Sequence, residues 1–129
     1  MAPNGVIRWY LLLLVAHVAH VFEEIWGRFW LIERVFGLGG FLIANTLIFS
    51  VPIAIFYFVL QERRGAYVAA MLYAALMILN GAAHNLATLV TGRYLDGFAG
   101  GFTGLGLIVI GVMLILQLRR AMTVGKETA

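Results

Sequence analysis

Residues 65–92 read GAYVAAMLYAALMILNGAAHNLATLVTG and contain no Asp, Glu, Lys or Arg. At a rise of 1.5 Å per residue this stretch makes a helix of about 42 Å, longer than the bilayer hydrocarbon core of about 30 Å. Two further uncharged runs, residues 35–61 and 97–118, are also long enough to cross a membrane. The sequence therefore predicts membrane-spanning helices.

The first apolar run is shorter than the others. Between Arg8 and Glu23 only residues 9–22 lack charge, and a helix of that length covers only about 21 Å. A first span of ordinary length must therefore carry Glu23 and Glu24 into the membrane or its near interface. We expect an all-α, four-transmembrane-helix bundle in a single domain, residues 1–129, with spans at about residues 6–29, 38–61, 65–91 and 98–120.

The composition excludes several classes of protein. Of the 129 residues, 63% are hydrophobic and 12% charged, against about 45–50% and about 25% in a soluble domain. Four spans leave no length for a nucleotide-binding domain. Lys and Arg lie at the ends of the apolar runs and form no basic patch, so we expect membrane lipids and no nucleic acid as partners. The chain contains no cysteine, which excludes disulfide and thiolate chemistry.

The distribution of Lys and Arg predicts the orientation. With four spans, three positive residues fall on one side and six on the other: Arg28, Arg34 and Arg93 against Arg8, Arg63, Arg64, Arg119, Arg120 and Lys126. Positive residues are more frequent in cytoplasmic loops. We therefore expect a multi-pass plasma-membrane protein with both termini in the cytoplasm. Residues 26–34, which include two tryptophans, then form a short interfacial segment on the outer side after the first helix.

Small residues predict close helix packing at two places. Overlapping G-x-x-x-G pairs occur at the entrance to the fourth span, and a stripe of small residues follows the third span: Gly97 with Gly101, Gly100 with Gly104, then Ala66, Ala70, Ala74 and Gly81. Packing within one bundle is the favoured interpretation, because four helices need such seams. A homo-oligomer through these Gly/Ala-rich faces is the alternative.

All three histidines fall within the expected spans, His17 and His20 on the first and His84 on the third. On a helix that turns about 100° per residue, His17, Glu23 and Glu24 lie within about 60° of His20. An ionisable group in hydrocarbon costs at least about 2.5–3.5 kcal/mol, and such groups usually face the bundle interior in pairs. One face of the first helix is therefore a candidate site.

The third span carries a matching polar row. Asn80 and His84 are spaced i, i+4, and Thr88 continues the row. The first and third spans run in the same direction, and Glu24 and His84 both fall about 8 Å beyond the midplane. We therefore expect one constellation in the outer half of the membrane, made of His17, His20, Glu23, Glu24, Asn80 and His84.

The segment His20-Val21-Phe22-Glu23-Glu24 resembles the signature of the HxxEE-motif family of small prokaryotic integral membrane proteins. The resemblance covers most of the chain, because a second histidine follows in a later span, His84, ahead of a Gly/Tyr-containing connection, residues 92–97. Asp96 stands where the family often has proline. The resemblance implies functional roles for His20, Glu23, Glu24 and His84, and it implies no particular reaction.

The residue types favour a divalent metal site. Imidazole and carboxylate suit Zn, Fe or Mn, and the three ligands His20, Glu24 and His84 would leave a position for water or substrate. Glu23 would be a fourth ligand or a general base. His17 and Asn80, and in a further alternative Glu23 itself, would orient the ligands. Glu24 lies between the two histidines on the wheel of the first helix and is therefore the expected inner ligand, with Glu23 at the edge.

Two alternatives to a metal enzyme remain open. In the first, the protein is a metal-free isomerase or cyclase of lipid or isoprenoid substrates, in which Glu23 or Glu24 exchanges a proton with the substrate and a histidine shuttles it. In the second, the histidines and glutamates only fix the register of two helices. The expected function is a membrane-embedded enzyme with a hydrophobic or lipid-like substrate, and its expected catalytic residues are His20, Glu23 and Glu24.

Overall fold

The computed structural model describes residues 2–29 and 32–127 of the chain. Four α-helices account for most of them: α1 (Asn4–Trp26), α2 (Gly37–Leu60), α3 (Arg64–Thr91) and α4 (Thr103–Glu127), with a short π-helical turn, η1 (Ile32–Phe36), between α1 and α2. All four are long and apolar enough to span a membrane. The predicted all-α, four-helix membrane fold is confirmed, and the described residues contain no strand.

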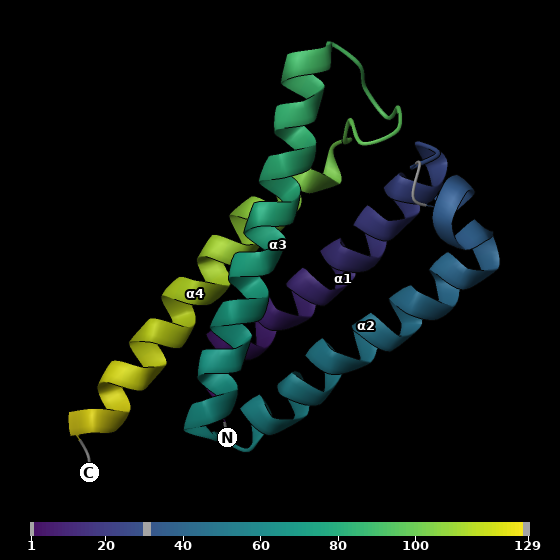
Figure 1. Cartoon of the computed structure of the whole chain (residues 1–129). Coiled ribbons are helices and arrows are strands. Elements are labelled where there is room, and N and C mark those ends of the chain that lie inside the picture. The colour runs from purple at the N-terminus through teal and green to yellow at the C-terminus, as the bar shows by residue number, and fades with distance from the viewer. Residues whose placement is uncertain (1, 30–31, 128–129) are drawn as a thin grey trace.

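The helices run alternately up and down, so that α1 and α3 point the same way (Figure 1). Helix α4 packs along both α1 and α3, whereas α2 packs mainly on α3 and buries the smallest share of its residues. The core lies where α4 meets its two neighbours, with Tyr10 and Leu13 from α1, Ala70 from α3, and Leu107 and Leu114 from α4 fully buried. Leu107 and Leu114 are two turns apart and therefore share one face of α4.

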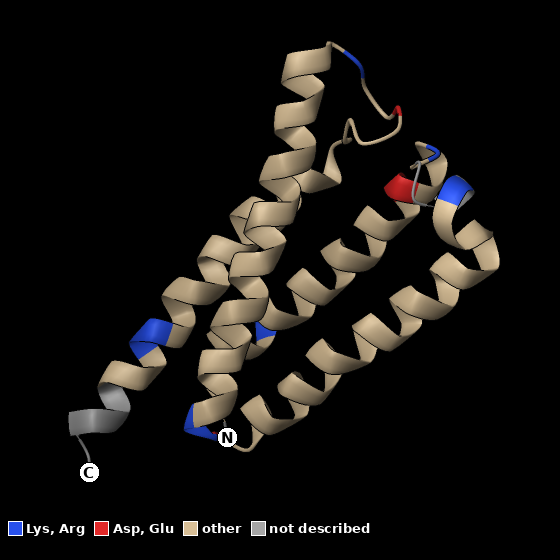
Figure 2. Cartoon of the chain, viewed as in Figure 1, with Lys and Arg blue, Asp and Glu red and all other residues tan. Residues whose placement is uncertain are grey.

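The charged residues lie at the two ends of the bundle (Figure 2). The end that holds both chain termini carries Arg8 on α1, Arg63 just before α3, Arg64 as the first residue of α3, and Arg119 and Arg120 on α4. Arg28, Arg34 and Arg93 lie at the opposite end. Lys126, the sixth residue of the expected cytoplasmic set, is outside the side chains that the structure describes. The same is true of Trp30 to Glu33 in the expected interfacial segment.

Helix α4 begins at Thr103, five residues after the start expected at 98. The chain between α3 and α4 leaves helical geometry because Gly92 ends α3 in the left-handed conformation, with φ 65°, and Leu95 and Gly97 also have positive φ. Two glycines make these turns without the penalty that a Cβ would bring. Gly97, Gly100 and Gly101 therefore lie outside the helix, and the expected G-x-x-x-G pairs do not form on α4.

The small residues instead bring α3 and α4 together within the chain. A Cβ added to Gly81 would collide with the backbone carbonyl of Gly104, and one added to Gly111 would lie 2.8 Å from the Ile78 side chain and 3.2 Å from the Ala74 carbonyl. Because these neighbours include backbone atoms, they cannot move aside cheaply. Packing inside one bundle, the interpretation favoured from the sequence, is the one that the structure contains.

Candidate metal centre

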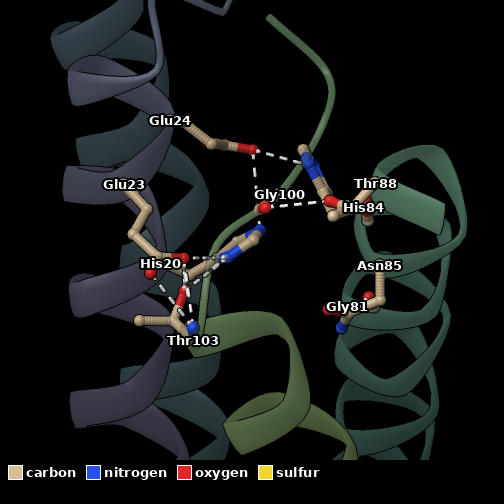
Figure 3. Close-up of polar contacts among 9 residues, drawn as sticks. All are labelled: His20, Glu23, Glu24, Gly81, His84, Asn85, Thr88, Gly100 and Thr103. Atoms are coloured by element: carbon tan, nitrogen blue, oxygen red, sulfur yellow. Dashed lines mark hydrogen bonds and ion pairs between the residues drawn. The ribbon is translucent and has the colours of Figure 1, made fainter. Parts of the chain in front are cut away.

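The candidate site lies at the end of the bundle remote from the chain termini. His20, Glu23 and Glu24 occupy the last two turns of α1, and His84 lies two turns before the end of α3. The side chains of His20, Glu24 and His84 converge between the two helices (Figure 3). The prediction that His84 approaches the His20 and Glu24 face of the first helix is confirmed.

Three of these residues each offer a ligand atom to a common point. The Nε2 atom of His84 lies 3.4 Å from Oε1 of Glu24, and Nε2 of His20 lies 3.8 Å from the same oxygen. All three ligand atoms lie within 4.8 Å of one another. Ligands on one tetrahedral ion, at bond lengths of about 2.0–2.2 Å, are about 3.3–3.6 Å apart. The Glu24–His84 pair already has this spacing, whereas His20 would have to move inward before all three ligand atoms reach it.

The site is buried among protein atoms. The side chains of His20 and His84 are 2% and 3% exposed, and that of Glu24 is 13% exposed. The Nε2 atom of His20 is a buried polar atom without a hydrogen-bond partner, because Glu24 at 3.8 Å is too far away to bond it. Buried polar atoms are normally paired, and an ion or a water is a common explanation for an exception.

Glu23 points away from this cluster and towards the start of α4. Its two carboxylate oxygens accept the backbone N–H of Thr103 at 3.1 Å each, and the Thr103 hydroxyl donates to Oε2 of Glu23. The same hydroxyl lies 2.9 Å from Nδ1 of His20. The structure thus separates the two glutamates, with Glu24 against His20 and His84 and Glu23 on the flank. The helical wheel predicts this separation, although it placed Glu24 between His17 and His20.

The connection between α3 and α4 closes the site from one side. The backbone N–H of Gly100 donates to the carbonyl oxygen of His84 at 3.1 Å, and the Thr88 hydroxyl donates to the carbonyl oxygen of Gly100 at 2.9 Å. A Cβ at Gly100 would lie 2.6 Å from the Cβ of His84, so only glycine permits this approach. The ring of Phe98 packs on the His84 ring, with centroids 4.3 Å apart.

The free space in the pocket is about 10 Å³, bounded by the site residues and the connection: His20, Glu23, Glu24, His84, Leu95, Gly97, Ala99, Gly100 and Gly101. Such a volume is about the minimum that holds one water molecule. The site can therefore hold an ion or a water between the described side chains, whereas the body of a lipid does not fit.

Two further residues expected at the site make other contacts. His17 hydrogen bonds through Nδ1 to the Tyr73 hydroxyl at 3.1 Å, and its ring packs on Phe49 with centroids 4.7 Å apart. Within residues 2–29 and 32–127, no hydrogen bond or ion pair joins His17 or Asn80 to the three candidate ligands. The supporting role of both residues stays a prediction.

Thr103 is the site residue that sequence reasoning missed. A threonine that follows a glycine-rich stretch and precedes an apolar run is typical of a helix start, and this signal was present at Thr103. The glycine spacing instead favoured a helix that already includes residues 97–104, and so it indicated an earlier helix start than Thr103.

Comparison with family models, curated proteins and solved structures gives no match for this chain.

Proposed function

We propose that the chain is an integral membrane protein that binds a divalent metal ion, Zn, Fe or Mn, through His20, Glu24 and His84. One observation carries the proposal: three potential ligand atoms from two helices lie within 4.8 Å of one another. The buried Nε2 of His20, which has no hydrogen-bond partner, gives independent support. We also propose membership of the HxxEE-motif family, on the same residues together with Glu23.

The ligand set favours a catalytic over a purely structural metal. Structural zinc sites are usually closed by four protein ligands, whereas three protein ligands leave one position for water or a substrate atom. An ion held in this way would supply a Lewis acid. The role of the chain would be to hold the two imidazoles and the carboxylate in place and to keep bulk water out.

We propose a membrane-embedded enzyme that acts on a hydrophobic or lipid-like substrate. The free space of about 10 Å³ limits what enters the site to a small polar group. The apolar part of the substrate would stay in the bilayer, against exposed side chains near this end of the bundle such as Phe22, Leu89 and Phe102, which are 65%, 81% and 75% exposed. The proposed location is the plasma membrane, with both termini in the cytoplasm, and it is supported by the arginine distribution.

Elemental analysis of untagged protein in mild detergent tests the proposal. We expect close to one transition-metal ion per chain, with loss of the ion in His20→Gln and His84→Gln. The matched control is His17→Gln, which changes another buried histidine of α1 and should keep the ion. A folded wild-type protein that takes up no Zn, Fe or Mn would contradict the proposal and favour the metal-free acid–base or structural interpretations.

A further inference from the structure

The hydroxyl group of Thr103 lies between His20 and Glu23, at the first residue of α4 (Figure 3). It contacts Nδ1 of His20 at 2.9 Å and is bonded to Oε2 of Glu23. The carboxylate of Glu23 also accepts the backbone N–H of Thr103. Three polar groups from α1 and α4 are therefore joined in one chain of hydrogen bonds.

The direction of these hydrogen bonds follows from the number of hydrogens. Both carboxylate oxygens of Glu23 accept the backbone N–H of Thr103, and Oε2 also accepts the hydroxyl of Thr103. A threonine hydroxyl has a single hydrogen, so when Thr103 donates it to Glu23, the hydroxyl oxygen can only accept from His20. The Nδ1 atom of His20 must then carry a hydrogen.

A neutral histidine carries a hydrogen on one ring nitrogen only, so Nε2 of His20 has a free lone pair. Nε2 is the buried atom without a hydrogen-bond partner, on the side of the ring that faces Glu24 and His84. We propose that Thr103 and Glu23 fix His20 in the tautomer that presents Nε2 as a ligand, which makes both of them positioning residues. The ligand part of this inference rests on the proposed metal site, whereas the tautomer does not.

Gly101 makes room for this arrangement. A Cβ at residue 101 would lie 2.5 Å from Oε1 and 2.6 Å from Cδ of Glu23. The carboxylate could turn away from such a Cβ, but it would then leave the backbone N–H and hydroxyl of Thr103. Glu23 thus has a defined place against α4. Glu23 therefore acts as a positioning residue, and not as the fourth ligand or general base that its residue type suggested.

The tautomer can be measured without metal. Nitrogen NMR of metal-free protein labelled with ¹⁵N-histidine in detergent distinguishes a protonated from an unprotonated ring nitrogen. In the wild type we expect the hydrogen of His20 on Nδ1, with its signals assigned by their loss in His20→Gln. Thr103→Val has nearly the same shape without the hydroxyl and should lose this preference. Thr103→Ser keeps the hydroxyl and should retain it.

Metal affinity supplies the second readout, with Zn²⁺ as the probe. Outer-shell partners of metal-bound histidines typically change affinity by about 10- to 100-fold, and we expect Thr103→Val to weaken Zn²⁺ binding within this range. Thr103→Ser should stay close to the wild type, and circular dichroism should show equal helix content in all three proteins.

Two results would overturn the inference: a hydrogen on Nε2 of His20 in the wild type, or a Thr103→Val protein with unchanged tautomer and affinity. If Thr103→Val does not fold, the test is which ring nitrogen of His20 carries the hydrogen in the wild type and in Thr103→Ser. A wild-type protein with the hydrogen on Nδ1 that binds no Zn, Fe or Mn would contradict the proposed metal site and leave the role of Thr103 in fixing the tautomer in place.

Discussion

The Nε2 atom of His84 on α3 lies 3.4 Å from Oε1 of Glu24 on α1. Two ligands of one tetrahedral metal ion have this spacing. The contact crosses between helices whose backbones make few direct contacts, because each of them packs mainly on α4. The side chains of Glu24 and His84, together with the connection before α4, therefore hold this end of α1 and α3 in register.

The two glutamates should differ when each loses its charge. Glu24→Gln removes a proposed ligand, and we expect Zn²⁺ affinity to fall by more than about 100-fold, beyond the range of about 10- to 100-fold typical of outer-shell changes. Glu23→Gln changes the hydrogen bonds to Thr103 and the 3.9 Å contact with Nδ1 of His20, and it should stay within that range. Isothermal titration or competition with a chelator measures both. A larger loss in Glu23→Gln than in Glu24→Gln, with both proteins folded, would reverse the assignment.

The seam between α3 and α4 can be tested by adding one methyl group. In Gly81→Ala the new Cβ would collide with the carbonyl of Gly104, and overpacking of this kind costs about 1–3 kcal/mol. Thermal or denaturant unfolding in detergent should show the loss. The matched control is Gly106→Ala on α4, where a Cβ meets nothing within 4 Å and helix propensity favours alanine by about 1 kcal/mol. Equal stability of the two variants would contradict this packing.

The hydrogen bond between Tyr73 and His17 predicts a structural effect without a metal effect. Tyr73→Phe removes the hydroxyl that lies 3.1 Å from Nδ1 of His17, and hydrogen bonds between membrane helices average about 0.6 kcal/mol, up to about 1.7 kcal/mol. We expect a loss of stability in this range and an unchanged metal content. A fall in metal affinity would instead give His17 the supporting role that the sequence suggested.

The orientation can be decided with single cysteines, because the chain has none of its own. Gln61→Cys and Tyr94→Cys place thiols at exposed positions at opposite ends of the bundle and leave every charged residue in place. A membrane-impermeant maleimide should label Tyr94→Cys on intact cells and Gln61→Cys only after lysis. Labelling in the opposite order would place both termini outside.

The sequence by itself determined the features that depend on helix geometry within one segment. Uncharged runs of sufficient length gave the number of spans, since backbone polar groups in hydrocarbon must be satisfied within a helix. The turn of about 100° per residue placed His20 and Glu24 on one face and set Glu23 to the side. The common direction of the first and third spans then brought His84 to the same level as Glu24.

Only the tertiary structure decided which residue of α4 meets Glu23. This depends on the path of the connection, where the positive φ values of Leu95 and Gly97 delay the start of α4 to Thr103. Glycine spacing predicts helical pairs only when the backbone is helical, and in this connection it is not. The partners of His20 Nδ1 and of the Glu23 carboxylate follow from that path, because a hydrogen bond between distant segments requires both backbones to be in place.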